Sequence, residues 1–276
     1  MSAIEDFDDI EGPIAPSMAV WSALSEAERR RVVASLPHVV EHDFMSEGDI
    51  HAGIVLDLAD ALRNHYGGGG PGGRRCYIGR SVMVLYPETR AFAPDLFLVF
   101  DVDDHPRKRF VVAQEGRGLD LAIEVQCDGD ASKDYRRNVS LYANVGITEY
   151  FIVDSNRTKI TGYRLEEGET SYRPILDQHG QLYSKVLDLW IGTLEGKFRV
   201  FFRDAVLPTT AELKERFRRE AELAIESAGV AQDRAENEAQ RAEAEAQRAA
   251  RLEEELQHLR NQLEELRANT QSRPRD

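Results

Sequence analysis

Cysteine is scarce in this chain, which has only Cys76 and Cys127 among its 276 residues. Two thiols cannot build a disulfide framework or a four-cysteine zinc site, so each is expected to be a small buried residue. No run of 18 apolar residues occurs either, and the acidic start of the chain is unlike the basic and apolar start of a secretory signal. We therefore expect a cytoplasmic protein that has no membrane partner.

An excess of basic charge is also missing, because the net charge is −14. Residues 1–50 carry 3 basic and 11 acidic side chains, residues 51–210 carry 20 and 22, and residues 211–276 carry 12 and 16. The middle segment is nearly neutral and gives no strong electrostatic signature of a DNA-binding protein. Local basic runs at 74–75, 106–109 and 133–137 could still contact phosphate, although such runs are more often solvated surface.

Several common enzyme motifs are absent. The sequence contains no GxSxG, no HExxH and no Cys-His pairing with a plausible spacing, so serine, zinc-protease and thiol chemistries have no support. The run GGGGPGG at 67–73 lacks the Lys-Ser/Thr pair of a P-loop and follows an expected helix where a P-loop follows a strand. We interpret it as a flexible loop without a phosphate-binding role.

The C-terminal segment has the composition of a long helix. From 211 to about 268 it lacks proline and has one glycine, with alanine, glutamate, arginine and glutamine dominating. Two heptad seams follow one another along it. They are out of phase, because Ala249 and Leu252 are three residues apart where the heptad pattern calls for four. The seams comprise Ala235, Ala239, Ala242, Ala246 and Ala249, then Leu252, Leu256, Leu259, Leu263 and Leu266. We expect a homo-oligomer formed through residues 235–266; a single exposed helix is the alternative.

The rest of the chain predicts a mixed α/β domain. A helix is expected over 49–66, strands over 76–78, 82–86, 95–100, 110–112 and 119–125, a helix over about 132–145 and a strand over 149–153, with shorter strands to 202. Ser25 and Glu28 make a possible capping box in an acidic N-terminal segment. The expected organisation is a partly ordered segment at 1–40, a domain at 41–207, a coiled-coil helix at 208–268 and a disordered tail at 269–276.

Two acidic residues on expected strands are candidates for a metal site. Asp95 begins one strand, and Glu124 lies inside another, where alternation points it to the same face as Gln126. Mg²⁺ binds oxygen and commonly takes one or two protein carboxylates, leaving waters for a substrate phosphate. Two carboxylates from neighbouring strands therefore suggest a metal ion that activates water and stabilises a phosphate transition state.

These residues lie within a longer pattern that resembles a known family. FAPDLFLVF, LDLAIEV and KDYRRNVSLYANVGITEYFIVD are similar to the signature of the Uma-two family of the PD-(D/E)XK nuclease superfamily, and the resemblance covers roughly 47–202. It implies an α/β fold with a restriction-endonuclease-like mixed β-sheet flanked by helices, followed by the long C-terminal helix or coiled coil. It also implies a Mg²⁺-dependent (or Mn²⁺-dependent) DNA endonuclease that hydrolyses phosphodiester bonds.

Carried over by position, the resemblance makes Asp95 and Glu124 the metal-binding acids, with the main-chain carbonyl of Val125 as a further ligand. The lysine of the motif does not match. Where relatives carry it two residues after the glutamate, this chain has Gln126, and where they carry it four residues before the tyrosine at 142, it has Asn138. A lysine there orients or deprotonates water and offsets phosphate charge, whereas glutamine supplies no charge.

Three outcomes stay open for the catalytic position. Lys133 could substitute from the start of the following helix, Gln126 could act alone, or the site could have lost catalysis. His51 is a weak supporting candidate, since a lone histidine is more often structural, and Asn138 is another.

Three hypotheses for the whole protein follow. The first is an endonuclease, and the second is an inactive nuclease-like module that binds nucleic acid or protein. The third is a scaffold whose coiled coil carries the function, since a fold does not fix a function by itself.

Overall fold

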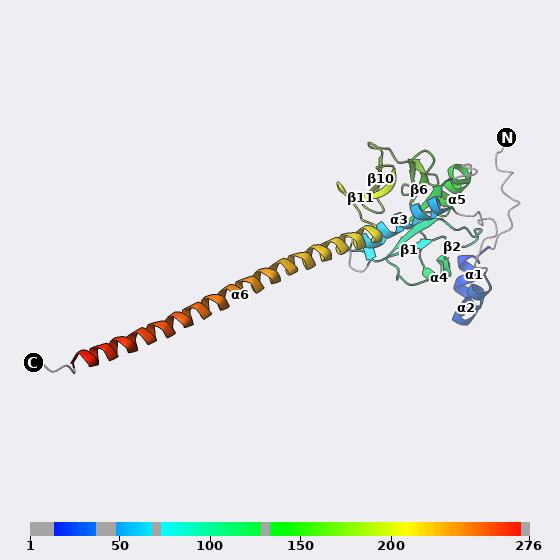
Figure 1. Cartoon of the computed structure of the whole chain (residues 1–276). Coiled ribbons are helices and arrows are strands. Elements are labelled where there is room, and N and C mark those ends of the chain that lie inside the picture. The colour runs from blue at the N-terminus through cyan, green and yellow to red at the C-terminus, as the bar shows by residue number, and fades with distance from the viewer. Residues whose placement is uncertain (1–13, 37–47, 68–72, 128–132, 272–276) are drawn as a thin grey trace, which may run out of the picture. The chain divides into compact units, whose positions relative to one another are not determined.

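The computed structural model describes residues 14–36, 48–67, 73–127 and 133–271 (Figure 1). By its internal contacts the chain divides into two units, Met1–Glu212 and Leu213–Asp276. The first holds the sheets and the shorter helices, and the described part of the second, which ends at Gln271, belongs to one long helix. The glycine run at 68–72 and the termini at 1–13 and 272–276 lie outside the described residues, so the expectations for them stay predictions.

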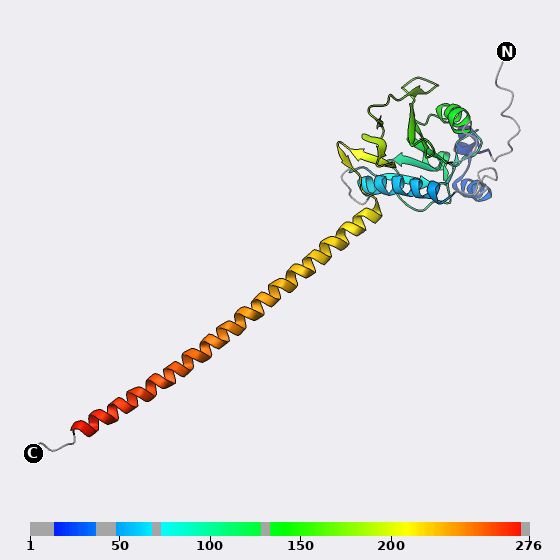
Figure 2. The same cartoon turned by 45° about the horizontal axis from the view of Figure 1, so that its top comes forward.

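A six-stranded mixed sheet forms the centre of the first unit (Figures 1 and 2). Its spatial order is β1 (Cys76–Arg80), β3 (Leu96–Phe100), β5 (Leu121–Gln126), β6 (Glu149–Asp154), β7 (Lys159–Arg164) and β8 (Arg173–Pro174). Only β5 and β6 run parallel; the other neighbours are antiparallel. The continuous apolar runs of β3 and β5 are buried on both faces, as expected for central strands covered on each side.

One face of this sheet packs against α3 (Asp49–Tyr66). Residues at helical spacing on α3, including Leu58 and Leu62, share a core with the alternate residues Leu121, Ile123 and Val125 of β5. Figure 2 shows α3 extended along the sheet. The helix expected over 49–66 is confirmed.

The other face packs against a two-part helix, η3 (Lys133–Asn138) followed by α5 (Val139–Asn144). The helical stretch expected over about 132–145 is confirmed, and its first part has π-helical geometry, which the sequence did not indicate. The wider winding of a π-turn changes which residues face the sheet, and such turns often occur at functional sites. Gly146 adopts a φ of 80° after α5, as expected for a left-handed helix cap.

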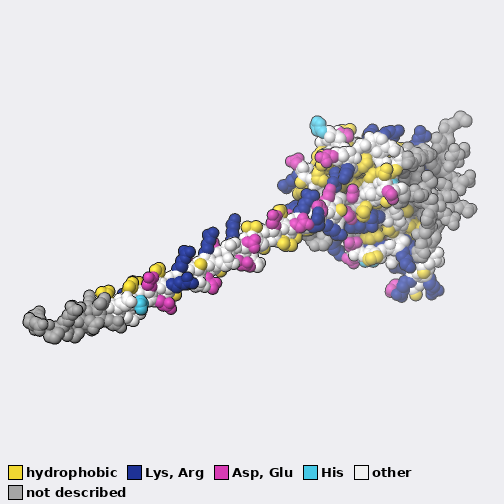
Figure 3. All heavy atoms as spheres, viewed as in Figure 1, with side chains coloured by type: hydrophobic (Ala, Val, Ile, Leu, Met, Phe, Trp, Pro, Cys, Tyr) yellow, Lys and Arg dark blue, Asp and Glu magenta, His cyan; other side chains and the backbone are white. Residues whose placement is uncertain are grey.

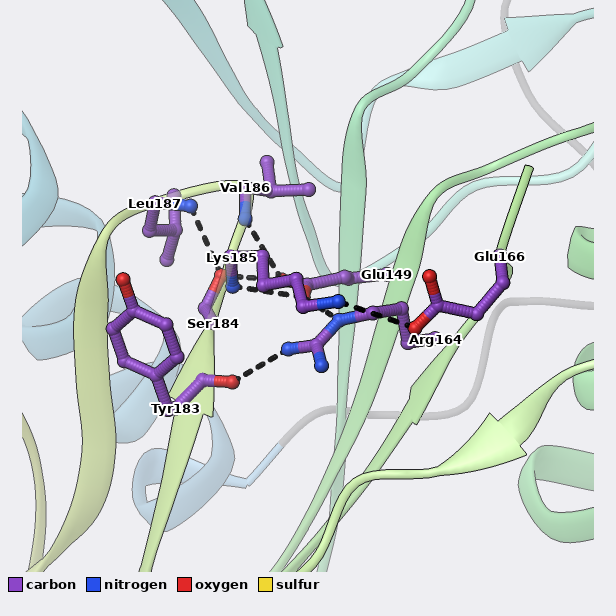
Figure 4. Close-up of polar contacts among 8 residues, drawn as sticks. All are labelled: Glu149, Arg164, Glu166, Tyr183, Ser184, Lys185, Val186 and Leu187. Carbon is purple, nitrogen blue, oxygen red and sulfur yellow. Dashed lines mark hydrogen bonds and ion pairs between the residues drawn. The ribbon is translucent and has the colours of Figure 1, made fainter.

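A second sheet of four strands completes the unit, in the order β12 (Ala205–Val206), β11 (Lys197–Phe202), β10 (Leu189–Leu194) and β9 (Gln181–Ser184). Its apolar face joins the core beneath α3. Glu149, the first residue of β6, connects the two sheets and is fully buried. Its carboxylate accepts hydrogen bonds from Arg164 Nε at 2.7 Å, from Lys185 N at 2.9 Å and from the Ser184 hydroxyl (Figure 4).

Smaller elements surround the sheets: α1 (Met18–Ala23), α2 (Glu26–Ser35), β2 (Met83–Leu85), β4 (Arg109–Val111) and α4 (Val112–Glu115). The strands β2 and β4 form a parallel pair. Ser25 and Glu28 form the expected capping box at the start of α2, each side chain bonding the other's backbone N–H.

The last element is α6 (Thr210–Gln271). Thr209 caps its start, since its hydroxyl accepts from Glu212 N and the Glu212 carboxylate accepts from Thr209 N. The expected long helix is therefore confirmed, and the expected boundaries at 207 and 268 stay predictions. No helix in the described part of the chain is long and apolar enough to cross a membrane.

Candidate metal-binding site

Asp95 and Glu124 come together where β3 begins and β5 approaches its end. The strand ladder pairs Leu96 with Ile123, so the residue before Leu96 lies beside the segment that contains Glu124. The backbone N–H of Asp95 faces Glu124 Oε2 at 3.3 Å. We call these two residues the carboxylate pair; the structure places them side by side, as their positions in the sequence predicted.

The Asp95 carboxylate extends the strand ladder beyond the end of β3. Its Oδ2 accepts a hydrogen bond from Val125 N at 2.7 Å, so a side chain takes the place of a strand carbonyl. The same oxygen lies 3.0 Å from His51 Nε2, at the beginning of α3, and both side chains are largely buried. The helix that covers one face of the sheet thereby contributes to the site.

The Glu124 carboxylate is held by donors from the opposite helix. Its Oε1 accepts from the Tyr142 hydroxyl at 2.5 Å and from Asn138 Nδ2 at 3.3 Å. Asn138 ends η3 and Tyr142 lies one turn later in α5, so the two side chains share a helix face. Glu124, Asn138 and Tyr142 are all buried.

Burial determines the protonation state of Tyr142. Removal from water, followed by the adjacent Glu124 charge, raises the pKa of the Tyr142 hydroxyl well above its ordinary value. Tyr142 therefore stays protonated at neutral pH and acts as a hydrogen-bond donor. The Tyr142 ring is buried in the core, and its hydroxyl bonds Glu124.

The side of β5 on which the main-chain carbonyl of Val125 lies follows from strand geometry. In an extended strand the N–H and C=O of one residue point to the same neighbouring strand. Val125 N–H points to Asp95, whereas the carbonyl of the next residue, Gln126, points to the other side and accepts from Ser155 N. The Val125 carbonyl thus lies on the side that a third oxygen ligand requires.

Of the two residues proposed to replace the lysine, the structure describes the side chain of Gln126 but not that of Lys133. Lys133 is the first residue of η3, and its side chain lies outside the described part of the chain, so its role stays a prediction. Gln126 is at the end of β5 on the same strand face as Glu124. Among the described residues, Gln126 Oε1 has no hydrogen-bond partner although it is buried.

The donor set fits a hard cation better than a soft one. No cluster of three or more His, Cys, Asp or Glu side chains suited to a metal occurs in the described ranges. The site offers instead two carboxylates and a carbonyl, the oxygen set that Mg²⁺ prefers. A carboxylate has about four lone-pair positions. The protein donors described above use some of these positions on Glu124 and on Asp95.

The thiols give no alternative chemistry at this site. Cys76 is on β1, and its burial raises the pKa of its thiol to about 12, which keeps it protonated and unreactive at neutral pH. Cys127 follows β5 and is partly buried.

Comparison with known families agrees with this geometry. Residues 42–194, more than half of the chain, match the sequence profile of Uma2, a family described as "Putative restriction endonuclease". The chain belongs to the Uma2 family. The matched region contains the carboxylate pair, η3 and α5, so the resemblance noted in the sequence is confirmed.

No curated protein sequence matches this Uma2 chain. Among solved structures it is similar to a crystal structure described as "a putative nuclease" from Anabaena variabilis. The two are 10% identical, with a TM-score of 0.40, over 51% of this chain and 75% of the other. A similarity at that level supports no conclusion about this chain by itself.

Two of the contacts were poorly foreseen from the Uma2 motif. Asn138 was considered as the residue in the lysine position and as a weak supporting candidate, and the tyrosine at 142 as the residue from which that position is counted. Their four-residue spacing on a helix was the available signal, because it places both on one face. What the spacing could not give was the rotation of that face toward Glu124, which depends on the π-turn.

Proposed function

We propose that this protein is a Mg²⁺-dependent (or Mn²⁺-dependent) endonuclease that hydrolyses phosphodiester bonds in DNA. The observation that carries the proposal is the carboxylate pair, in which Asp95 N–H faces Glu124 and Asp95 accepts a hydrogen bond from Val125 N. Membership of the Uma2 family supports the same conclusion.

Asp95, Glu124 and the Val125 carbonyl would hold the metal. Bound there, Mg²⁺ would lower the pKa of a water molecule and offset the charge that develops on the phosphate. The protein's own contribution is orientation. Tyr142 and Asn138 fix the Glu124 carboxylate from one side, and His51 fixes Asp95 from the other. Such supporting contacts commonly change metal affinity or activity 10- to 100-fold, as an order of magnitude.

The candidates for orienting the attacking water are Gln126 and Lys133. The Gln126 side chain can bond water through an oxygen that no described residue engages, but it supplies no charge. Lys133 precedes Asn138 by five residues on η3 and would supply that charge. Replacing each by alanine separates the two roles.

Basic side chains close to the site favour a polyanionic substrate. Arg136 and Arg137 are in η3 beside Asn138, and Arg136 is exposed. At the end of the sheet, the strand ladders place Gln126 opposite Asp154 and Asp154 opposite Lys159, which is exposed. Lys159 lies two strands from Gln126, and Arg136 is on the helix that carries Asn138, so both could contact a phosphate backbone.

We also propose that the protein is a homo-oligomer through residues 235–266. The leucines Leu252, Leu256, Leu259 and Leu263 lie on one helix and are each about half exposed or more. A seam of that kind is stable in water when a second helix covers it. Two linked active sites would suit cleavage of both strands.

One alternative has a specific observation in its favour. Glu124 already accepts three protein hydrogen bonds, and Asn138 holds the position where relatives carry lysine. These features suit an inactive nuclease-like module that binds nucleic acid or protein. A module of this kind would bind DNA with little dependence on metal.

Plasmid cleavage with Mg²⁺ or Mn²⁺ tests the proposal. Wild-type protein is compared with Glu124→Gln and Asp95→Asn, which keep the shape of each side chain and remove its charge. The matched control is Glu166→Gln, on an exposed glutamate whose partner is Lys185. Nicking by the wild type and the control, and none by the two site variants, is expected. Equal nicking by all four proteins would point to a contaminant and sink the enzyme proposal.

Metal binding is measured separately, by calorimetric titration of Mn²⁺ into the same proteins. Wild type and Glu166→Gln are expected to bind, and Asp95→Asn is expected to bind at least 10-fold more weakly. Metal binding without cleavage would support the inactive module. No metal binding by the wild type would remove the proposed site.

A further inference from the structure

The flanking charges of the two heptad seams on α6 differ sharply. Around the alanine seam, the positions beside the seam residues are occupied by Glu236, Glu238, Glu243 and Glu245. A second copy would meet glutamate with glutamate there, whatever its direction, and like charges oppose pairing. The alanine seam is therefore a poor contact surface.

The leucine seam has flanks of mixed sign. With Leu252 and Leu259 as heptad position d and Leu256 and Leu263 as position a, the charged g positions are Arg248 and Glu255 and the e positions are Glu253 and Arg260; the third g position is the neutral Gln262. All four flanking residues are exposed on a continuous helix. Figure 3 shows basic and acidic side chains interleaved along this helix.

In a parallel, in-register coiled coil, each g residue faces the e residue five positions later on the partner helix. That rule pairs Arg248 with Glu253 of a second copy and Glu255 with Arg260 of a second copy. Each pair occurs twice by symmetry, and every one joins opposite charges. The leucine faces, with exposed fractions of 49–60%, supply the apolar seam between them.

We propose that this protein associates with a second copy of itself through residues 248–263, with the two helices parallel and in register. The inference rests on the proposed oligomer and adds its direction and its extent. Because the nuclease-like unit precedes α6 in each chain, a parallel pair attaches both units at the same end of the coiled coil. An antiparallel pair would attach them at opposite ends.

Disulfide trapping in the full-length protein tests the direction. In a parallel, in-register pair, position d faces position d, within the Cα separation of about 4.4–6.8 Å that a disulfide allows. Leu259→Cys is expected to form a covalent dimer under mild oxidation. The control Gln257→Cys lies on the outer face and is expected to stay monomeric on a non-reducing gel. Wild type, with Cys76 and Cys127, gives the background.

Charge exchange tests the pairing itself. Glu255→Arg and Arg260→Glu each place like charges together and are expected to weaken self-association at least 10-fold by analytical ultracentrifugation. The double variant Glu255→Arg/Arg260→Glu restores opposite charges and is expected to recover most of the loss. Glu254→Arg makes the same change of charge on the outer face, so it controls for net charge.

Different outcomes test self-association and the parallel direction of the two helices. A wild-type protein that sediments as a monomer overturns self-association altogether, and with it this inference. Wild-type dimers without a Leu259→Cys disulfide, or without recovery in the double variant, overturn only the parallel register. Plasmid cleavage is scored independently of both results.

Discussion

The Tyr142 hydroxyl donates a hydrogen bond of 2.5 Å to Glu124 Oε1, joining α5 to the centre of the sheet. Tyr142 is almost completely buried and its pKa is raised, so this donor is present at every pH near neutrality. Asn138 donates to the same oxygen from one turn earlier. The helical segment that follows β5 thus orients the Glu124 carboxylate through two hydrogen bonds, in the absence of a metal or a substrate.

Tyr142→Phe removes this hydrogen bond while keeping the ring. Loss of this donor to a buried carboxylate should cost about 1–3 kcal/mol of folding stability, measured by urea denaturation. If Glu124 is a metal ligand, Mn²⁺ affinity should also fall roughly 10-fold or more, measured by calorimetry.

The control for this variant is Tyr172→Phe. Tyr172 is another partly buried tyrosine, and its hydroxyl donates to Ile147 O, away from the carboxylate pair. It should lose stability without a change in Mn²⁺ affinity. An unchanged Mn²⁺ affinity in both variants would mean that Tyr142 supports only the fold.

Strand alternation was enough to place Glu124 and Gln126 on one face, and the apolar run of β3 was enough to place Asp95 at its start. Those positions depend on the alternation of side chains along a strand, which can be read from a few consecutive residues. The contacts of Glu124 depend on a π-turn, and no local pattern in KDYRRN distinguishes a π-turn from an α-helix. Helical spacing places Asn138 and Tyr142 on one helix face, but it does not say that this face points toward Glu124.

The junction between the two sheets was missed for a related reason. Glu149 begins an apolar strand, and the sequence did not indicate its long-range contacts, yet its carboxylate bonds residues 15 to 37 positions away. Contacts of that range arise from how β9 folds back onto β6 and β7. A single sequence holds no periodic signal for such contacts.

Arg164→Met tests how much this junction contributes to stability. It leaves the buried Glu149 carboxylate without its cation, which should cost about 3–5 kcal/mol in free energy of unfolding. The control Arg173→Met removes an exposed arginine paired with Glu169 and should cost no more than about 1 kcal/mol. Urea denaturation measures both.

A double variant, Glu149→Gln/Arg164→Met, separates the buried charge from the packing of the arginine. It should be less destabilised than Arg164→Met alone, because no unpaired carboxylate remains in the core. Equal losses in the single and double variants would attribute the effect to packing.

The buried tyrosines predict a loss of stability at alkaline pH. Burial is the first cause that raises the pKa of Tyr66, Tyr86, Tyr142 and Tyr172 above the ordinary value. Their contribution is fully present below about pH 10, where unfolded tyrosine titrates, and is lost as the pH rises toward the folded pKa values.

Thermal unfolding followed by circular dichroism between about pH 8 and pH 11 measures this effect, with tyrosinate absorbance recorded in parallel. The melting temperature should fall above about pH 10. The buried tyrosines should form tyrosinate only as the protein unfolds. Tyrosinate signal from all nine tyrosines in the still-folded protein would contradict the prediction.

Asn138→Lys tests whether the missing charge limits the site. Asn138 is buried and touches Glu124, and it occupies a position where Uma2 relatives, by the sequence resemblance, carry lysine. A lysine there would bring an ammonium group to the carboxylate pair, which can orient water and offset phosphate charge. Plasmid cleavage should rise at least 10-fold over wild type, if Asp95 and Glu124 hold the metal.

The matched control is Asn138→Met, which has a similar length and no charge. Both variants enlarge a buried side chain and should lose similar stability, about 1–3 kcal/mol from overpacking. Only the lysine variant should gain activity, and adding Glu124→Gln to it should abolish the gain. Equal activity in the lysine and methionine variants would show that charge at this position does not limit the reaction, and would leave Lys133 as the residue to test by alanine substitution.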